Sequence, residues 1–416
     1  MPPVQLSALV LLLALGVATG VYWLIVFGHI LATARLPTPR SALRGSRAAS
    51  LLTVGSSPAL PRVCVVVPAH NEEAVIGALA GSLLKQDYPR LSVVFSLDRC
   101  TDATAEILGR AIAGDPRFSI HVVDSCPEGW AGKVHAIHSA VVGSASARDA
   151  DLLLFTDADT VFDPACVRAC VALLEERGLD LLSLLSTLTS DRWFERVVQP
   201  AAGMELARQY PPRRVGRGRA SRPFANGQFM LFRRAAYEAV GGHAAAKDQL
   251  LEDIDLARRV AWSDRTVGVF MAHGMLRCRM YPDWAAFRRG WKRIYTEAAN
   301  CKPSRLRQAA LRLGLCGVIM PLGSLVGLIA GTIVAPGGGD ARDLAIACAT
   351  AGACGLGSML TALVGAMRLG SSPVSSAALY PLGAAATMRI LAEAADELQR
   401  GEPVRWGGRE YVRPVR

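Results

Sequence analysis

The chain has 416 residues, of which 51% are hydrophobic, and its formal net charge is +11. This length and apolar content fit either two ordinary globular domains or one domain with membrane-spanning helices. Basic residues lie beside the apolar runs, so we attribute much of the positive charge to membrane topology and attraction to the membrane surface. We therefore do not expect the protein to bind nucleic acid.

Long apolar runs that contain no Lys, Arg, Asp or Glu favour the membrane interpretation. They cover residues 1–34, 313–339 and 344–367, and each exceeds the roughly 20 residues that cross a bilayer. The first run lacks the basic start and short apolar centre of a cleaved signal peptide. Buried core helices are the alternative, which runs of this length disfavour. We predict a transmembrane helix over 1–34 and two further spans in a membrane region over 301–396.

Basic residues flank the central region on both sides, as Arg35, Arg40, Arg44 and Arg47 and then as Lys302, Arg305, Arg307 and Arg312. Such an excess marks cytoplasmic flanks, so we expect a multi-pass protein of the inner (cell) membrane with an outside N-terminus and a cytoplasmic catalytic domain. A weaker apolar stretch over 374–391 contains Pro381 and Arg389. We predict that it re-enters or lies in the interface, with a further span as the alternative, and that the basic tail, 397–416, is cytoplasmic.

Residues 35–61, rich in Pro, Ser, Ala and Arg, are predicted to form a linker. The segment Val63-Cys-Val-Val-Val-Pro-Ala-His-Asn-Glu-Glu73 then begins with a β-branched run typical of a strand buried on both faces. A helix to about residue 86, a strand over 91–97 and another helix follow. This repeat of strand, polar turn and helix predicts an α/β domain over 62–300 with a parallel sheet of the nucleotide-binding type. Ligands bind at the carboxyl ends of such strands.

The next two units supply charged side chains at the same predicted edge. Gly129-Trp-Ala-Gly-Lys133 opens a helix, where amide N–H groups and Lys133 can hold a diphosphate; a simple helix cap is the alternative. The strand over 151–160 ends in Asp157 and Asp159. Alternate residues of a strand share a face, so both carboxylates can converge on one Mg²⁺ or Mn²⁺ while Ala158 points away. A strand end followed by a polar turn is the alternative.

Further candidates lie downstream. Residues 225–232 form a turn that leads into a strand and contain Gly227 and Gln228, while Glu252 and Asp253 begin a helix. A helix dipole stabilises such a carboxylate by about 0.3 to 1 kcal/mol, so capping is the alternative to a chemical role. The aromatic residues Trp284, Phe287, Trp291 and Tyr295 recur at helical spacing, with Arg288, Arg289, Lys292 and Arg293 between them. This helix either lies in the membrane interface or packs its aromatic stripe on the domain core.

Four of these segments together resemble the GT-A core of the family 2 inverting glycosyltransferases. They are Val-Val-Val-Pro-Ala-His-Asn-Glu-Glu, the segment 98–104, Gly-Trp-Ala-Gly-Lys and Asp-Ala-Asp. The likeness covers roughly residues 63–300 and is greatest to membrane-anchored bacterial members, such as the carotenoid-pathway and hopanoid-associated enzymes. It implies a nucleotide-diphospho-sugar transferase domain with a Rossmann-like mixed sheet flanked by helices, plus transmembrane helices.

The resemblance also implies roles for individual residues. Pro68, Ala69, His70, Asn71, Glu72 and Asp98 would line the base and ribose pocket of a nucleotide sugar, Lys133 and Asp157 would contact ribose or diphosphate, and Asp159, helped by Asp157, would bind the metal. Asp253, beside Glu252, would be the general base, and Gly227, Gln228, Arg288 and Trp291 would lie on the acceptor side. The chain departs from the family at Leu97, where an acid is frequent, and in Arg288-Arg-Gly-Trp291, which lacks an Arg-Trp pair.

We therefore expect a metal-dependent hexosyltransferase that uses Mg²⁺ or Mn²⁺. It would move a sugar from a nucleotide-sugar donor, a UDP-sugar first, to a hydroxyl of a lipid or isoprenoid acceptor at the cytoplasmic face. The alternatives are a polyprenyl-phosphate glycosyltransferase, whose acceptor needs no general base, and a polysaccharide synthase. A membrane scaffold with an inactive GT-A domain is the non-enzymatic alternative, against which the intact metal carboxylates argue.

Overall fold

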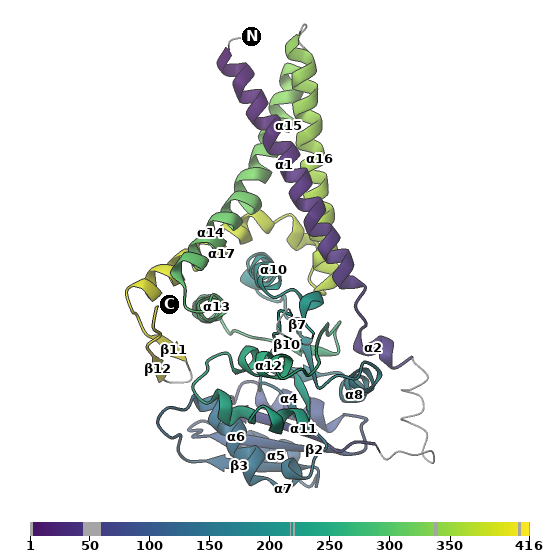
Figure 1. Cartoon of the computed structure of the whole chain (residues 1–416), viewed down its shortest axis with the longest axis vertical. Coiled ribbons are helices and arrows are strands. Elements are labelled where there is room, and N and C mark those ends of the chain that lie inside the picture. Colours follow the sequence, from purple (N-terminus) through teal and green to yellow (C-terminus); the bar gives the residue numbers. More distant parts are fainter. Residues whose placement is uncertain are drawn as a thin grey trace.

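The computed structural model describes residues 3–44, 60–216, 218, 221–336, 340–406 and 409–415. Most of the predicted linker, 45–59, lies outside these residues, as do Arg47 and Arg416 and the side chains of Arg405 and Arg409. The described ranges form an α/β domain from which long apolar helices extend as a stalk (Figure 1).

The strands belong to the domain and to the C-terminal tail. They are β1 Val63–Ala69, β2 Leu91–Asp98, β3 Phe118–Val123, β4 Leu152–Phe155, β5 Thr160–Phe162, β6 Leu181–Leu185, β7 Thr187–Leu188, β8 Met230–Arg233, β9 Val267–Met271, β10 Leu276–Cys278, β11 Val404–Trp406 and β12 Arg409–Tyr411. The domain helices are α2 Pro39–Ala42, α4 Ile76–Leu84, α5 Thr104–Ile112, α6 Gly132–Gly143, α7 Ala145–Arg148, α8 Cys166–Glu176, α9 Trp193–Val197, α10 Gln199–Gln209, α11 Arg234–Ala239, α12 Glu252–Trp262 and α13 Trp284–Ala298. Short 3₁₀ turns occur at η1 Pro212–Arg214, η2 Gly242–Ala246 and η4 Val374–Ala377.

The main sheet has the strand order β3-β2-β1-β4-β8-β6-β9. Strand β1 pairs in parallel with β2 and with β4, whereas β8 runs antiparallel to its neighbours β4 and β6. In register, Val63 lies opposite Leu91 on one side and Leu152 on the other. The turns that follow β1, β2 and β4 therefore emerge at one edge of the sheet, and β8 makes the sheet mixed.

Helices cover both faces of this sheet, which explains why every residue of β1 is buried. The side chain of Val65 packs in one cluster with α4 and α8, and that of Val66 packs in another with α6 and α12. Alternate residues of a strand point to opposite faces, so a strand with both faces covered needs apolar residues at every position. The predicted α/β fold is confirmed.

The stalk consists of α1 Pro3–Ala34, α15 Met320–Val334 and α16 Asp340–Leu369 (Figure 1). Helix α14 Pro303–Gly314 continues into α15 through a π-helical turn, Leu315–Ile319. Among the described residues, the helices long and apolar enough to cross a membrane are Val4–Ala42, Pro303–Val334 and Ala341–Leu369. They coincide with the apolar runs of the sequence.

Small residues let the stalk helices approach closely. A Cβ on Gly16 of α1 would lie 2.8 Å from the backbone carbon of Ala351 in α16. Thr19 of α1 and Ser324 of α15 are fully buried, and the Ser324 hydroxyl donates to the Thr19 hydroxyl at 2.8 Å. In a bilayer, where lipid provides no hydrophobic force between helices, close packing and such hydrogen bonds would hold the stalk together.

Helix α17 Tyr380–Gln399, which includes most of the weaker apolar stretch, lies across the base of the stalk against α10, α13 and α14 (Figure 1). It is not one of the candidate spans among the described residues. After it, Arg413 of the tail ion-pairs with Glu297 of α13. The tail and the α/β domain therefore lie on the same side of the stalk.

Helix α13 packs its aromatic stripe inward. Phe287, Trp291 and Tyr295 are buried in a cluster with α10, α14 and α17, so the stripe packs on helices at the base of the stalk and not on the sheet core. The interfacial position of this helix stays a prediction. Two of its basic residues face acids of α17, because Arg288 pairs with Glu393 and Lys292 with Glu397.

The stalk contacts predict a strong dependence on Gly352 of α16. In Gly352→Ala, the new Cβ would meet the Ser324 carbonyl oxygen and would lie 2.8 Å from the Leu328 nitrogen, and overpacking of this kind costs about 1–3 kcal/mol. Gly357→Ala in the same helix is the matched control, since a Cβ there has nothing within 4 Å. We expect the first variant alone to lower the melting temperature of the detergent-purified protein. Equal melting temperatures would contradict the packing.

Candidate functional site

A cavity of about 1060 Å³ lies between the carboxyl edge of the sheet and the base of the stalk. Its lining includes the turns after β1 and β4, the start of α6 and the start of α12. It also includes residues of α1, α10 and α14 and the end of α16. One continuous space therefore joins the sheet edge to the apolar helices.

The turns after β1 and β2 hold each other in place. Asn71 has a positive φ of 56°, and its side-chain oxygen accepts from the Thr101 N–H at 2.8 Å. The Glu73 carboxylate accepts from the Ala103 N–H at 3.0 Å, and the Asp102 carboxylate accepts from the Glu73 N–H at 3.1 Å. These reciprocal bonds fix the backbone between β1 and α4, and they turn Asn71 toward the β2 turn.

Asp98 lies at the end of β2 and is 3% exposed. Arg99, whose φ is 49°, donates Nε and Nη2 to its two carboxylate oxygens at 2.8 and 2.7 Å. The carbonyl oxygen of Asp98 accepts from His70 Nδ1 at 2.6 Å. A bidentate pair of this type is geometrically specific, so the carboxylate faces the cavity already neutralised by Arg99.

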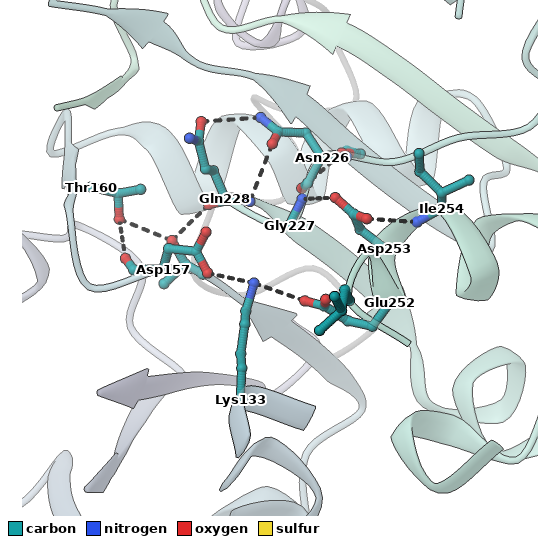
Figure 2. Close-up of polar contacts among 12 residues, drawn as sticks. Lys133, Asp157, Thr160, Asn226, Gly227, Gln228, Glu252, Asp253 and Ile254 are labelled. Carbon is teal, nitrogen blue, oxygen red and sulfur yellow. Dashed lines mark hydrogen bonds and ion pairs between the residues drawn. The ribbon is translucent and has the colours of Figure 1, made fainter. Parts of the chain in front are cut away.

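Lys133 occupies the centre of the site (Figure 2). Its Nζ lies 2.7 Å from Asp157 Oδ1 and 2.7 Å from Glu252 Oε1. Burial alone would lower the pKa of Lys133, but the two carboxylates outweigh it and raise that pKa above its usual value. Burial would raise the pKa of Glu252, which is 2% exposed, yet Lys133 reverses this and holds it below its usual value. Each of Lys133 and Glu252 therefore favours the charged form of the other.

The sequence predicts that Asp157 and Asp159 lie at the end of a strand over 151–160. The structure corrects this prediction. Strand β4 ends at Phe155, and both carboxylates lie in the turn before β5. The turn is closed by Thr160, whose hydroxyl donates to the Asp157 carbonyl at 2.8 Å. Burial and the nearby Asp157 charge raise the pKa of Asp159 to about 7. The pKa of Glu72 is also raised to about 7, by burial and then by Asp159 and Asp157.

This crowding of carboxylates fits a cation. Asp159 Oδ1 is buried and has no hydrogen-bond partner among the described residues, so it is an unsatisfied hard oxygen ligand. The described chain shows no group of three or more His, Cys, Asp or Glu side chains arranged to hold a metal. Asp157 and Asp159 can thus supply only part of a coordination sphere, and phosphate or water oxygens would have to complete it.

Asp253 stands opposite Lys133 at the start of α12 (Figure 2). Its Oδ2 accepts from the Gly227 N–H at 2.8 Å, and its Oδ1 accepts from the Ile254 N–H at 2.8 Å. Burial, with the neighbouring Glu252 charge, raises its pKa to about 7. A carboxylate aimed by two backbone amides and poised near neutral pH has the properties of a general base.

Most predicted site residues converge on the cavity. Its lining contains Pro68, Ala69, His70, Glu72, Asp98, Lys133, Asp157, Asp159, Gly227, Gln228, Glu252, Asp253 and Trp291. Asn71 and Arg288 are not in the lining. Asn71 instead bonds to the β2 turn, and Arg288 is drawn to Glu393 of α17. No pattern in the sequence indicates the lining residues Trp23, Glu205, Arg208 and Tyr411, because the fold brings α1, α10 and the C-terminal tail to the cavity from distant parts of the chain.

The bridging position of Lys133 predicts a specific pattern of stabilities. Lys133→Met leaves Glu252 buried without its cation, which we expect to cost about 3 kcal/mol in the free energy of unfolding. Adding Glu252→Gln removes the stranded charge and should restore most of that loss. Thermal unfolding of the wild type, both single variants and the double variant measures the coupling. A double variant as unstable as Lys133→Met would show that the stranded Glu252 charge is not the cause of the loss.

Comparisons with known proteins identify the family of the chain. Residues 61–283 match a family model described as "Glycosyltransferase like family 2". The 4,4'-diaponeurosporenoate glycosyltransferase of Staphylococcus aureus (strain MRSA252) is 28% identical over 268 residues, 64% of this chain and 68% of that protein. The mannosyltransferase PcManGT from Pyrobaculum calidifontis, solved with GDP-Man and Mn²⁺, is 17% identical with a TM-score of 0.46, covering 93% of this chain and 99% of its own.

A second solved structure, S. aureus TarS 1–349 in complex with UDP-GlcNAc, is 14% identical with a TM-score of 0.40 and covers 85% of this chain and 96% of its own. The family match extends over more than half of the 416 residues. It includes β1, the Lys133 turn, the Asp157 and Asp159 turn and the Asp253 helix. The chain therefore belongs to the glycosyltransferase-like family 2, whose GT-A transferase fold it combines with apolar stalk helices.

Proposed function

We propose that the protein transfers a sugar, with inversion, from a nucleotide-sugar donor to a hydroxyl of a membrane lipid at the cytoplasmic face of the inner membrane. The observation that supports this most is the single cavity lined both by Asp157, Asp159 and Asp253 and by Trp23 and Ile30 of α1. A freely soluble acceptor would have no need of a site walled by apolar stalk helices. A UDP-sugar is the donor to test first.

The donor end of the cavity suits a nucleoside diphosphate. Lys133 supplies a buried cation between two carboxylates, and Gly132 begins α6 so that backbone amides face the same space. A divalent cation held by Asp159 and Asp157 would neutralise charge on the departing diphosphate. A cation also offsets the repulsion that the anionic donor would otherwise meet from Glu72, Asp157 and Asp159.

Asp253 is the proposed general base. It takes the proton of the acceptor hydroxyl while that oxygen attacks the anomeric carbon, and the bond from this carbon to the diphosphate breaks on the opposite face. One displacement of this kind inverts the anomeric centre. The Gly227 and Ile254 amides hold the carboxylate in one orientation throughout.

The lipid acceptor is supported by the position of the stalk and by the relative from S. aureus, whose name gives 4,4'-diaponeurosporenoate as the molecule it glycosylates. Basic residues on the cytoplasmic flanks favour the proposed orientation. In that orientation the three candidate spans leave the domain and the Arg413 tail on the same side, as their ion pair requires.

The base assignment predicts a selective loss in Asp253→Asn. Transfer of labelled sugar from a panel of nucleotide sugars into a lipid extract should fall by about 10²–10⁴-fold, the usual contribution of general base catalysis. Asp255→Asn is the control on the same helix, because Asp255 pairs with Arg259 on the outer side and should leave transfer unchanged. The deprotonated form of Asp253 is lost as pH falls through about 7. The wild-type rate should therefore decline about tenfold per pH unit below that value and level off above it.

Three outcomes would count against this mechanism. Full activity in Asp253→Asn would favour an acceptor whose attacking oxygen is already anionic, such as a polyprenyl phosphate. Equal losses in Asp253→Asn and Asp255→Asn would indicate damage to α12 in place of a lost base. Absence of labelled lipid with every donor and metal would overturn the lipid acceptor.

The metal assignment predicts weaker Mn²⁺ binding in Asp159→Asn. Electron paramagnetic resonance of Mn²⁺ with UDP and the full-length protein should show an affinity at least about tenfold below that of the wild type, since even outer partners of a metal contribute this much. The melting temperature should not fall, because the substitution removes a carboxylate that burial disfavours. Asp151→Asn, at the other end of β4, is the control. Unchanged Mn²⁺ binding in Asp159→Asn would refute the assignment.

A further inference from the structure

The cavity carries opposite charge at its two ends. Toward the sheet edge, which we call the donor end, the lining acids are Glu72, Asp98, Asp157, Asp159, Glu252 and Asp253. Toward the stalk the lining carries Arg208, Arg213, Arg214, Arg222 and Arg312, which we call the basic end. Glu205 is the only acidic side chain among the described lining residues that belong to the stalk side of the cavity. These residues come from α1, α10, the 211–222 loop, α14 and the end of α16. A ligand in this half of the cavity therefore meets an excess of positive charge.

Arginines from separate helices are fixed at this end by one buried carboxylate. Glu205 of α10 is 4% exposed, and its Oε1 accepts from Arg208 Nη2 at 3.0 Å and from Arg312 Nη2 of α14 at 2.6 Å. One carboxylate neutralises one guanidinium, so the trio keeps a net positive charge. Each guanidinium has five N–H donors, so both arginines retain donors for an anion.

The remaining arginines extend this charge to the rim of the cavity. The side chains of Arg213, Arg214 and Arg222 are exposed and form no ion pair with any residue that the structure describes. The η1 turn, which holds Arg213 and Arg214, contacts α1. The rim therefore lies beside a stalk helix, where an anionic head group in the bilayer surface can reach it.

Apolar side chains stand next to the basic end. The lining includes Trp23, Val26 and Ile30 of α1, Met204 of α10 and Leu313 of α14. A small water-soluble anion would gain nothing from these contacts, because hydrophobic stabilisation grows with the apolar area removed from water. The combination matches one molecule that joins a long hydrocarbon chain to an anionic group.

We propose that the acceptor is an acidic lipid whose carboxylate or phosphate binds Arg208 and Arg312 while its chain lies against α1 and Leu313. This inference rests on the proposed function, in which a hydroxyl of the same lipid lies at Asp253. The diphosphate of the donor is the competing anion, but it has Lys133 and the metal carboxylates at the other end. The acidic group on the acceptor thus selects the lipid, and Asp253 activates its hydroxyl.

Binding of defined probes tests this without requiring transfer. Full-length protein is placed in nanodiscs of phosphatidylcholine, so that no bulk lipid carries net charge, and equilibrium binding of tritiated hexadecyl phosphate is compared with that of hexadecanol. We expect the phosphate to bind at least about tenfold more tightly, as charge-assisted bonds from two arginines imply. Arg312→Gln and Arg208→Gln should each remove about tenfold of this preference, while Arg312→Lys should retain part of it.

Matched variants guard against a general loss of structure. Arg196→Gln on α9 is the charge control, since Arg196 is exposed and bonds to the Ser190 carbonyl outside the cavity. Leu313→Trp should exclude both probes from the chain site, whereas Leu311→Trp, at a position that is 73% exposed, should not. UDP affinity should be unchanged in all of these variants.

The outcomes separate this inference from the proposed function. Equal binding of the two probes, or a preference unaffected by both arginine substitutions, overturns the acidic-lipid site even if the wild type transfers sugar. A fall in UDP affinity in Arg312→Gln, with lipid binding intact, would assign the arginines to the donor and also overturn it. Arginine-dependent binding of hexadecyl phosphate by a protein that transfers no sugar would instead defeat the proposed function alone.

Discussion

The site depends on one cation held among several acids. Lys133 comes from the start of α6, whereas its partners Asp157 and Glu252 come from the turn after β4 and from the start of α12. Without a positive charge between them, these carboxylates would repel one another in a partly buried space, where charge interactions are stronger than in water. Lys133 therefore fixes α12 against the sheet edge, and with it the Asp253 carboxylate and the Gly227 turn.

The acids that form no ion pair with Lys133 behave differently. Asp159, Glu72 and Asp253 all have a pKa raised to about 7 by burial and neighbouring charge. The unloaded site is thus short of positive charge. Under the proposed function, an anionic donor would enter with least repulsion when it brings a cation, which would couple donor binding to metal binding. The raised pKa of Asp253 is also what its proposed role as general base near neutral pH would require.

Much of this site was predictable because its residues follow parallel strands. The β-branched run of β1 and the apolar run of β4 identify buried strands locally, and the carboxyl ends of parallel strands meet at one edge. That rule places Pro68, Asp98 and Asp157 together without knowledge of any contact. It does not give the length of a strand, and the end of β4 at Phe155 puts Asp157 and Asp159 in a turn. The spacing of residues in α13 likewise predicts an aromatic stripe but not the helices that pack on it. Those helices, such as α17 with Glu393 beside Arg288, are remote in the sequence.

The basic end could not be predicted for a related reason, and it changes the meaning of the stalk. Arg312 is one more basic residue beside an apolar run until the fold brings it to Glu205 of α10. The stalk is closed by Gly16 and by the Ser324 to Thr19 hydrogen bond, yet one turn further along α1, Trp23 and Val26 face the cavity. A tether would need only length and hydropathy. Because α1 also forms a wall of the cavity, the proposed function would have its side chains help to determine which molecule reaches Asp253, and the apolar stalk and the acceptor site would then be one structure.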